Sequence, residues 1–226
     1  MSLEKYIKEQ NNSNFSLSGI QVSILDPLIT KSDLNFRYIV SKAASLIPSH
    51  LMYDVDKIVF GPNDIFKKRD LQGLYRKGVV YLSGNQDTEG EVLDDLIHEI
   101  SHSIEDRYND IIYSDGLLER EFLTKRRQLK TKLSKFKIDK RMFDNPEYDI
   151  KFDKVLYKQV GYDFLTAVSS NIFFSPYAAT SLREYFANGF EAFYMREEVE
   201  KLKKVSPVLY TKIVELNNID KKEKNR

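Results

Sequence analysis

Residues 98–102 are His-Glu-Ile-Ser-His, and this motif constrains the chain more than any other feature of the sequence. On an α-helix, residues four apart lie one turn apart on the same face, so His98 and His102 can contact one metal ion. Glu99 stands beside them, where its carboxylate can reach a water bound to that ion. The alternative is a helix that carries two solvated histidines by chance. Because the chain has only three histidines and two are in this motif, we expect a metal-binding helix.

The sequence around the motif has the periodicity of an amphipathic helix. We expect this helix from about Gly90 to Tyr108, entered through acidic residues, which favour a helix N-terminus. Upstream, residues 78–83 are β-branched or aromatic and predict a strand that ends in a Gly-Asn turn. The apolar residues that recur three and four apart on the helix are Leu93, Leu96, Ile97, Ile100 and Ile104.

Composition limits the classes of fold and function. With 226 residues and 42% hydrophobic content, the chain can bury a substantial core, and we expect one domain over residues 31–226. Lys and Arg total 35 against 34 Asp and Glu, so the chain as a whole lacks the charge of a nucleic-acid-binding protein. There is no cysteine, so His, Asp or Glu side chains must hold any metal.

The ends and apolar segments of the chain bear on its location. The first residues, Met-Ser-Leu-Glu-Lys-Tyr, are too polar for a secretory signal. No apolar run approaches the roughly 20 residues that span a bilayer. We therefore expect a soluble protein without a membrane span, either cytoplasmic or delivered outside without a cleavable signal peptide.

Other elements are expected on both sides of the motif. Residues 1–30 are predicted to form an irregular N-terminal arm, in which Asn residues are frequent. Ser32 or Asp33 is the expected cap of a helix that Pro48 ends. Residues 55–60 alternate in a way that predicts a strand.

A segment rich in lysine and arginine follows the motif helix. From Gly116 to about Arg141 the pattern is helical, with an apolar seam at helical spacing. The plain interpretation is a solvated helix face, and the alternative is a docking surface for an acidic substrate or a nucleic acid. The basic residues are Lys125, Arg126, Arg127, Lys130, Lys132, Lys135, Lys137, Lys140 and Arg141.

The last informative block follows a predicted apolar helix over residues 155–174. Pro176 ends that helix, and Thr180 or Ser181 can cap the next one. Glu184 lies in the first turns of this next helix among aromatic residues. Burial of a carboxylate is costly unless a positive group meets it, and zinc is the expected positive group.

These two blocks resemble the zinc metallopeptidase domain of anthrax lethal factor and its relatives, which include the secreted Pro-Pro endopeptidases of clostridia. The resemblance covers residues 73–108 and 175–194. The first block contains Gly73-Leu74-Tyr75, the strand at 78–83, the His-Glu-x-x-His motif and Asp106, four positions after its second histidine. The second contains Tyr177 and, seven residues later, Glu184-Tyr185-Phe186-Ala187.

The resemblance implies a fold and a set of roles. The expected fold is an α+β, zincin-like metallopeptidase domain, mostly helical, with a small mixed sheet and a helical basic insertion at about 109–161. Glu184 would be the third zinc ligand, Glu99 the general base and Tyr177 a donor to the transition state.

Two residues are expected to support the ligands, and one position departs from the family. Asp106 would act behind the histidines and Asn188 behind Glu184, although the family tends to have glutamate at the position of Asn188. By sequence spacing alone, Glu119 and Glu121 also stay open as the third ligand.

The expected function is that of a zinc-dependent endopeptidase with one Zn²⁺ per chain, acting on a protein or peptide substrate. A toxin- or effector-like protease, or one encoded by a phage or mobile element, fits the resemblance. The alternative is a catalytically inactive zincin-fold protein with a binding or regulatory role. If the strand lies at a sheet edge, its backbone would pair with an extended substrate. The strand residues are Gly78, Val79, Val80, Tyr81 and Leu82.

Overall fold

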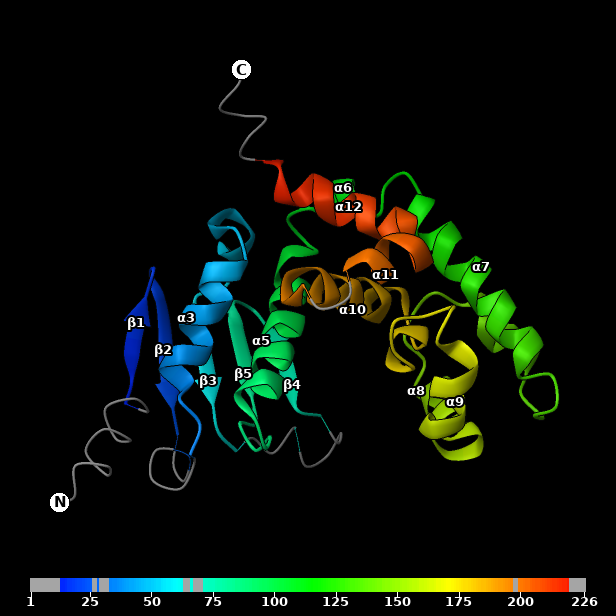
Figure 1. The fold of residues 1–226 in the computed structure, drawn as a ribbon, viewed down its shortest axis with the longest axis horizontal. Coiled ribbons are helices and arrows are strands. Elements are labelled where there is room, and N and C mark those ends of the chain that lie inside the picture. Colours follow the sequence, from blue (N-terminus) through cyan, green and yellow to red (C-terminus); the bar gives the residue numbers. More distant parts are fainter. Residues whose placement is uncertain are drawn as a thin grey trace. The chain divides into compact units, whose positions relative to one another are not determined.

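The computed structural model describes residues 13–25, 28, 33–62, 66, 71–196 and 199–219. The chain is of the α+β class and divides into two compact units, Met1–Asp106 and Arg107–Arg226. The first unit carries a mixed sheet, and the described elements of the second are helical (Figure 1). The single domain predicted over residues 31–226 stays a prediction.

The sheet of the first unit has five strands in the order β1-β2-β3-β5-β4 (Figure 1). β1 and β2 are antiparallel, β2, β3 and β5 run parallel, and β4 pairs antiparallel with β5. Alternate residues of the central strands are buried, for example Ile58, Phe60, Val80 and Leu82, so one face of the sheet forms core. The strands are β1 (Phe15–Leu17), β2 (Ile20–Ile24), β3 (Lys57–Phe60), β4 (Gly73–Arg76) and β5 (Val79–Leu82).

Two long helices, α3 (Phe36–Leu46) and α5 (Glu89–Ile104), pack against each other, and α5 also packs on β4 and β5 (Figure 1). A short 3-10 helix, η1 (Ser49–Met52), follows α3. Helix α5 begins with a reciprocal cap: the Thr88 hydroxyl accepts from the Glu91 amide, and the Glu91 carboxylate accepts from the Thr88 amide. This cap satisfies two amides at the helix start and fixes where the helix begins.

Two predictions for the first unit were wrong. The arm predicted to be irregular contains β1 and β2, because Ile20, Val22 and Ile24 alternate as buried residues of a paired strand. The cap of α3 is Asn35, whose side chain accepts from the Tyr38 amide at 2.9 Å, and not Asp33. Ser32 lies outside the described residues.

The described part of the second unit consists of helices and the segments that connect them. Helix α10 packs against α12, α11 and α7, and the ring of its Tyr185 packs with the rings of Phe122 and Phe173. The α-helices are α6 (Asn109–Ile112), α7 (Leu117–Lys132), α8 (Ile150–Val155), α9 (Tyr162–Ser169), α10 (Leu182–Met195), α11 (Val199–Val205) and α12 (Pro207–Asn217). The shorter turns are η2 (Lys140–Asp144), a π-helical turn at Leu156–Val160 and η4 (Tyr177–Ala179).

The basic segment also differs from its prediction. Its helix ends at Lys132 rather than near Arg141, and Lys125 and Arg126 are buried rather than solvated. Further on, the helix predicted over residues 155–174 is interrupted at Gly161, whose φ of 83° favours glycine. Among the described helices, none combines the length and the apolar character needed to cross a membrane.

Candidate metal-binding site

The two histidines of the motif project from one face of α5, as the spacing predicts. The centroids of the His98 and His102 rings are 5.1 Å apart, and the ring planes are nearly perpendicular, at 79°. Both side chains are half-buried. Two imidazoles held this close on a rigid helix can share one metal ion without a change of backbone.

A carboxylate that the sequence analysis missed contacts the second histidine. Nδ1 of His102 lies 2.6 Å from Oε1 of Glu105, which is itself buried. This contact occupies Nδ1 and leaves Nε2 as the nitrogen that can bind a metal, an arrangement common at histidine ligands. Asp106, for which the sequence predicted such a role, is exposed in the turn after α5, and its role stays a prediction.

Glu99 lies against the edge of the sheet. Its side chain is 8% exposed, and a Cβ added at Gly73 of β4 would stand 2.6 Å from Oε1 of Glu99. The carboxylate can therefore occupy this position only because residue 73 has no side chain. Gly73 thus has a steric role, because it leaves room for the side chain of Glu99.

The strand proposed to pair with a substrate is not at the edge of the described sheet. β5 (Val79–Leu82) hydrogen-bonds to β3 on one side and to β4 on the other, so its backbone groups are already paired. Gly78 precedes the strand, and the edge position belongs to β4. The edge position that the prediction required is therefore not met, and the prediction is wrong for Gly78, Val79, Val80, Tyr81 and Leu82. Strand order depends on pairing between distant segments, which the local sequence does not reveal.

Glu184 lies in the first turn of α10, in the second unit. The Ser181 hydroxyl accepts from the Glu184 amide at 3.2 Å and caps the helix. The Asn188 side chain donates to the Glu184 carbonyl at 3.1 Å and accepts from the Ser175 hydroxyl. Asn188 therefore joins the turn that carries Glu184 to the loop before Tyr177.

Tyr177 lies in η4, and its carbonyl accepts from the amide (2.9 Å) and the hydroxyl (2.7 Å) of Thr180. Burial is the main cause that raises the pKa of Tyr177, and the charge of Glu184 raises it further. The phenol is therefore protonated at neutral pH and can donate a hydrogen bond. Burial and nearby charges, Glu184 among them, also raise the pKa values of Tyr148 and Tyr162 to about 12. The sequence analysis did not single out these two phenols.

A buried arginine of α7 holds the start of α10. Arg126 donates to the carbonyls of Thr180 (2.6 Å), Met142 (2.8 Å) and Asn145 (2.9 Å). Its guanidinium also packs against the rings of Phe122 and Phe152. Because Thr180 precedes the Ser181 cap, the basic helix helps to position Glu184.

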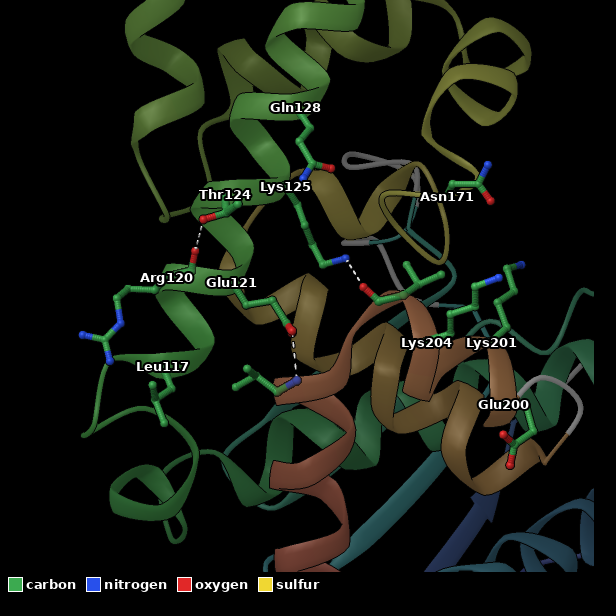
Figure 2. A pocket seen from close by; sticks show the side chains of 12 residues that line it. Leu117, Arg120, Glu121, Thr124, Lys125, Gln128, Asn171, Glu200, Lys201 and Lys204 are labelled. Atoms are coloured by element: carbon green, nitrogen blue, oxygen red, sulfur yellow. Dashed lines mark hydrogen bonds between the residues drawn. The ribbon is translucent and has the colours of Figure 1, made fainter.

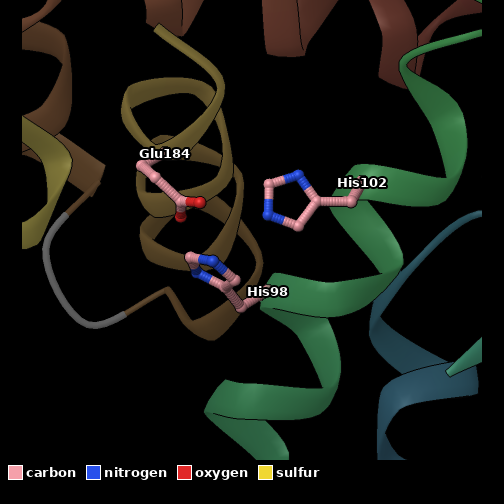
Figure 3. Close-up of side chains that lie close together, drawn as sticks. All are labelled: His98, His102 and Glu184. Atoms are coloured by element: carbon pink, nitrogen blue, oxygen red, sulfur yellow. The ribbon is translucent and has the colours of Figure 1, made fainter. Parts of the chain in front are cut away.

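The other two carboxylates that spacing left open differ from Glu184. Glu121 accepts from the Tyr185 hydroxyl (2.8 Å) and from the amides of Val208 (2.9 Å) and Leu209 (3.1 Å), so it caps α12. Glu119 is exposed on α7. Among the described residues, the side chains grouped as candidate metal ligands are those of His98, His102 and Glu184 (Figure 3).

Comparison of the chain with protein-family models, with curated proteins and with solved structures finds no match.

Proposed function

We propose that this protein is a zinc-dependent endopeptidase of the zincin-like kind that hydrolyses peptide bonds in a protein substrate. The observation that carries the proposal is the geometry of α5, where His98 and His102 share one face and Glu99 lies between them in the sequence. The contact between Glu105 and His102 supports the proposal, because histidines that bind a metal commonly have a carboxylate at the other ring nitrogen.

The proposed zinc ligands are His98, His102 and Glu184. Two imidazoles and one carboxylate are a ligand set that suits Zn²⁺ and leaves a coordination position for water. The residues fit the ion, since the contact to Glu105 leaves Nε2 of His102 for it. Bound zinc would supply a water of lowered pKa and would polarise the scissile carbonyl.

The chain's own residues supply the remaining chemistry of the proposal. Glu99 accepts the proton of the attacking water and passes it to the leaving amine. Tyr177, protonated at neutral pH, donates a hydrogen bond to the oxygen that becomes negative. β4 lies at the edge of the described sheet and next to Glu99, so its backbone would pair with an extended peptide.

Peptide-library cleavage with zinc supplied tests this proposal. We expect the wild type to hydrolyse peptide bonds and Glu99→Gln to lose turnover while it keeps its zinc, because glutamine cannot accept the proton and no ligand changes. A chelator should abolish wild-type cleavage, and added zinc should restore it. If the zinc-loaded wild type cleaves no peptide beyond those that Glu99→Gln also cleaves, the proposal fails and the protein has a binding or regulatory role.

A further inference from the structure

We propose that a cleft in the second unit, between α7 and α11, binds an acidic peptide segment. The cleft has a volume of about 1010 Å³, and its walls come from α7, α11, the start of α12 and Asn171 (Figure 2). All of these elements belong to the second unit. The cleft thus contains none of the residues assigned to the proposed metal centre.

The charge of the cleft is positive. Four of its lining side chains are cationic, and two carry carboxylates. The carboxylate of Glu121 accepts hydrogen bonds from two α12 amides and from the Tyr185 hydroxyl, so its oxygens are already engaged although it keeps its charge. Glu200 is the other carboxylate. The cations are Arg120, Lys125, Lys201 and Lys204.

One of these cations holds the walls of the cleft together. The Lys125 ammonium donates to the carbonyls of Ile172 and Val205, each at 2.6 Å, and the side chain is only 6% exposed. One side chain therefore connects α7 to the loop after α9 and to the end of α11 (Figure 2). A cleft fixed in this way needs little ordering when a ligand binds, which favours affinity.

The other three lining cations come from α7 and α11, and Arg120 also donates to the Asp115 carbonyl at 3.5 Å. Arg120 projects from α7, whereas Lys201 and Lys204 project from α11, one turn apart (Figure 2). Arg120 and Lys204 are exposed, and Lys201 is half-buried with its ammonium 4.8 Å from the ring of Phe174. Leu117 of α7 and Val208 of α12 add apolar surface to the lining.

This distribution fits a peptide better than a nucleic acid. A cleft of this volume accommodates several linked residues, and its separated cations can meet successive carboxylates along an extended chain. Single-stranded nucleic acid is usually bound by stacking of its bases on aromatic side chains. The described lining residues include no aromatic side chain.

Fluorescence anisotropy with a short labelled peptide in which glutamate alternates with alanine tests the proposal. The chelated protein should be used, so that the result does not depend on the proposed zinc site. We expect binding that weakens as salt increases, because the interaction is between charges. The triple variant Arg120→Glu, Lys201→Glu and Lys204→Glu should raise Kd about tenfold or more, since each reversal replaces attraction by repulsion.

The matched control reverses three exposed lysines outside the cleft: Lys132→Glu, Lys135→Glu and Lys137→Glu. Both triple variants change the net charge equally, so a similar loss in both would mean unspecific attraction and would overturn the proposal. Absence of wild-type binding at low salt, or tighter binding of a labelled single-stranded oligonucleotide, would also overturn it. Circular dichroism checks folding, and if the cleft variant does not fold, Lys204→Gln alone must still raise Kd by a measurable factor.

Discussion

The carboxylate of Glu105 limits which nitrogen of His102 can bind a metal. A histidine has two ring nitrogens, and the hydrogen bond made by one sets the role of the other. With Nδ1 held 2.6 Å from Glu105, the ring is oriented before any ion binds. A ligand oriented in advance loses little conformational freedom when the metal arrives.

The residues of the motif were predictable from the sequence, and their supporting carboxylate was not. The spacing of His98 and His102 fixes their common face once α5 is known to be a helix. Glu105 and Asp106 follow His102 by three and four residues, and both spacings bring side chains together on a helix. The helix ends at Ile104, and Glu105 directly after it keeps helical dihedral angles (φ −61°, ψ −41°), which leaves its side chain on the side of His102.

Tyr177→Phe tests which phenol acts on the substrate. We expect the fold and the zinc content to be kept, KM to change little and kcat to fall by roughly 10²–10³, the loss typical of removing one donor to the oxyanion. Steady-state kinetics on a cleaved peptide provide the measurement. Tyr148→Phe and Tyr162→Phe are the controls, because both phenols also lie within the influence of Glu184. A larger loss in either control would reassign the donor.

At the scale of elements, strand order was the main property that the sequence could not provide. β5 was predicted as a strand with nearly correct bounds, because its residues are β-branched and aromatic. Its place between β3 and β4 depends on pairing with distant segments. The strand β2 was missed although Ile20, Val22 and Ile24 alternate, since the Asn-rich segment before it favoured an irregular arm.

The contact between β4 and α5 gives a prediction at this scale. In Gly73→Ala, the new methyl group would meet Oε1 of Glu99 at 2.6 Å and Cγ at 2.7 Å, so the Glu99 side chain must move. We expect zinc binding to be kept and kcat to fall by about 10²-fold, as for other small displacements of reacting groups.

Gly90→Ala is the matched control for this substitution. Gly90 lies on the same helix as Glu99, and an added Cβ there would stand 3.8 Å from the Thr88 hydroxyl, an ordinary contact. Its turnover should equal that of the wild type, and its helix should be slightly more stable. Equal turnover of Gly73→Ala and Gly90→Ala would contradict the steric role of Gly73.

At the scale of the whole molecule, the basic segment contains both buried and exposed cations. Sequence analysis treated residues 125–141 as one cationic face, but Lys125 and Arg126 are buried and bind backbone carbonyls. Burial lowers the pKa of Lys125 to about 8 and that of Arg126 to about 9. Their partners lie far away in the sequence, so neither periodicity nor composition could separate them from the exposed lysines.

The proposed ligands come from distant parts of the sequence, since His98 and His102 lie on α5 and Glu184 lies on α10. The sequence analysis chose Glu184 by the resemblance and by its aromatic setting. The use of Glu121 as the cap of α12 supports this choice, because a carboxylate with three hydrogen-bond donors is already satisfied.

Zinc titration of the wild type, Glu184→Ala and Glu119→Ala tests this account most directly. It should be done at about pH 8, above the ordinary pKa of histidine, so that protons do not compete for the ligands. We expect one zinc per wild-type chain and the same affinity in Glu119→Ala. In Glu184→Ala the affinity should fall by more than the roughly 10- to 100-fold that loss of a supporting partner costs. Unchanged affinity in Glu184→Ala, or a wild type that stays free of metal, would contradict the account.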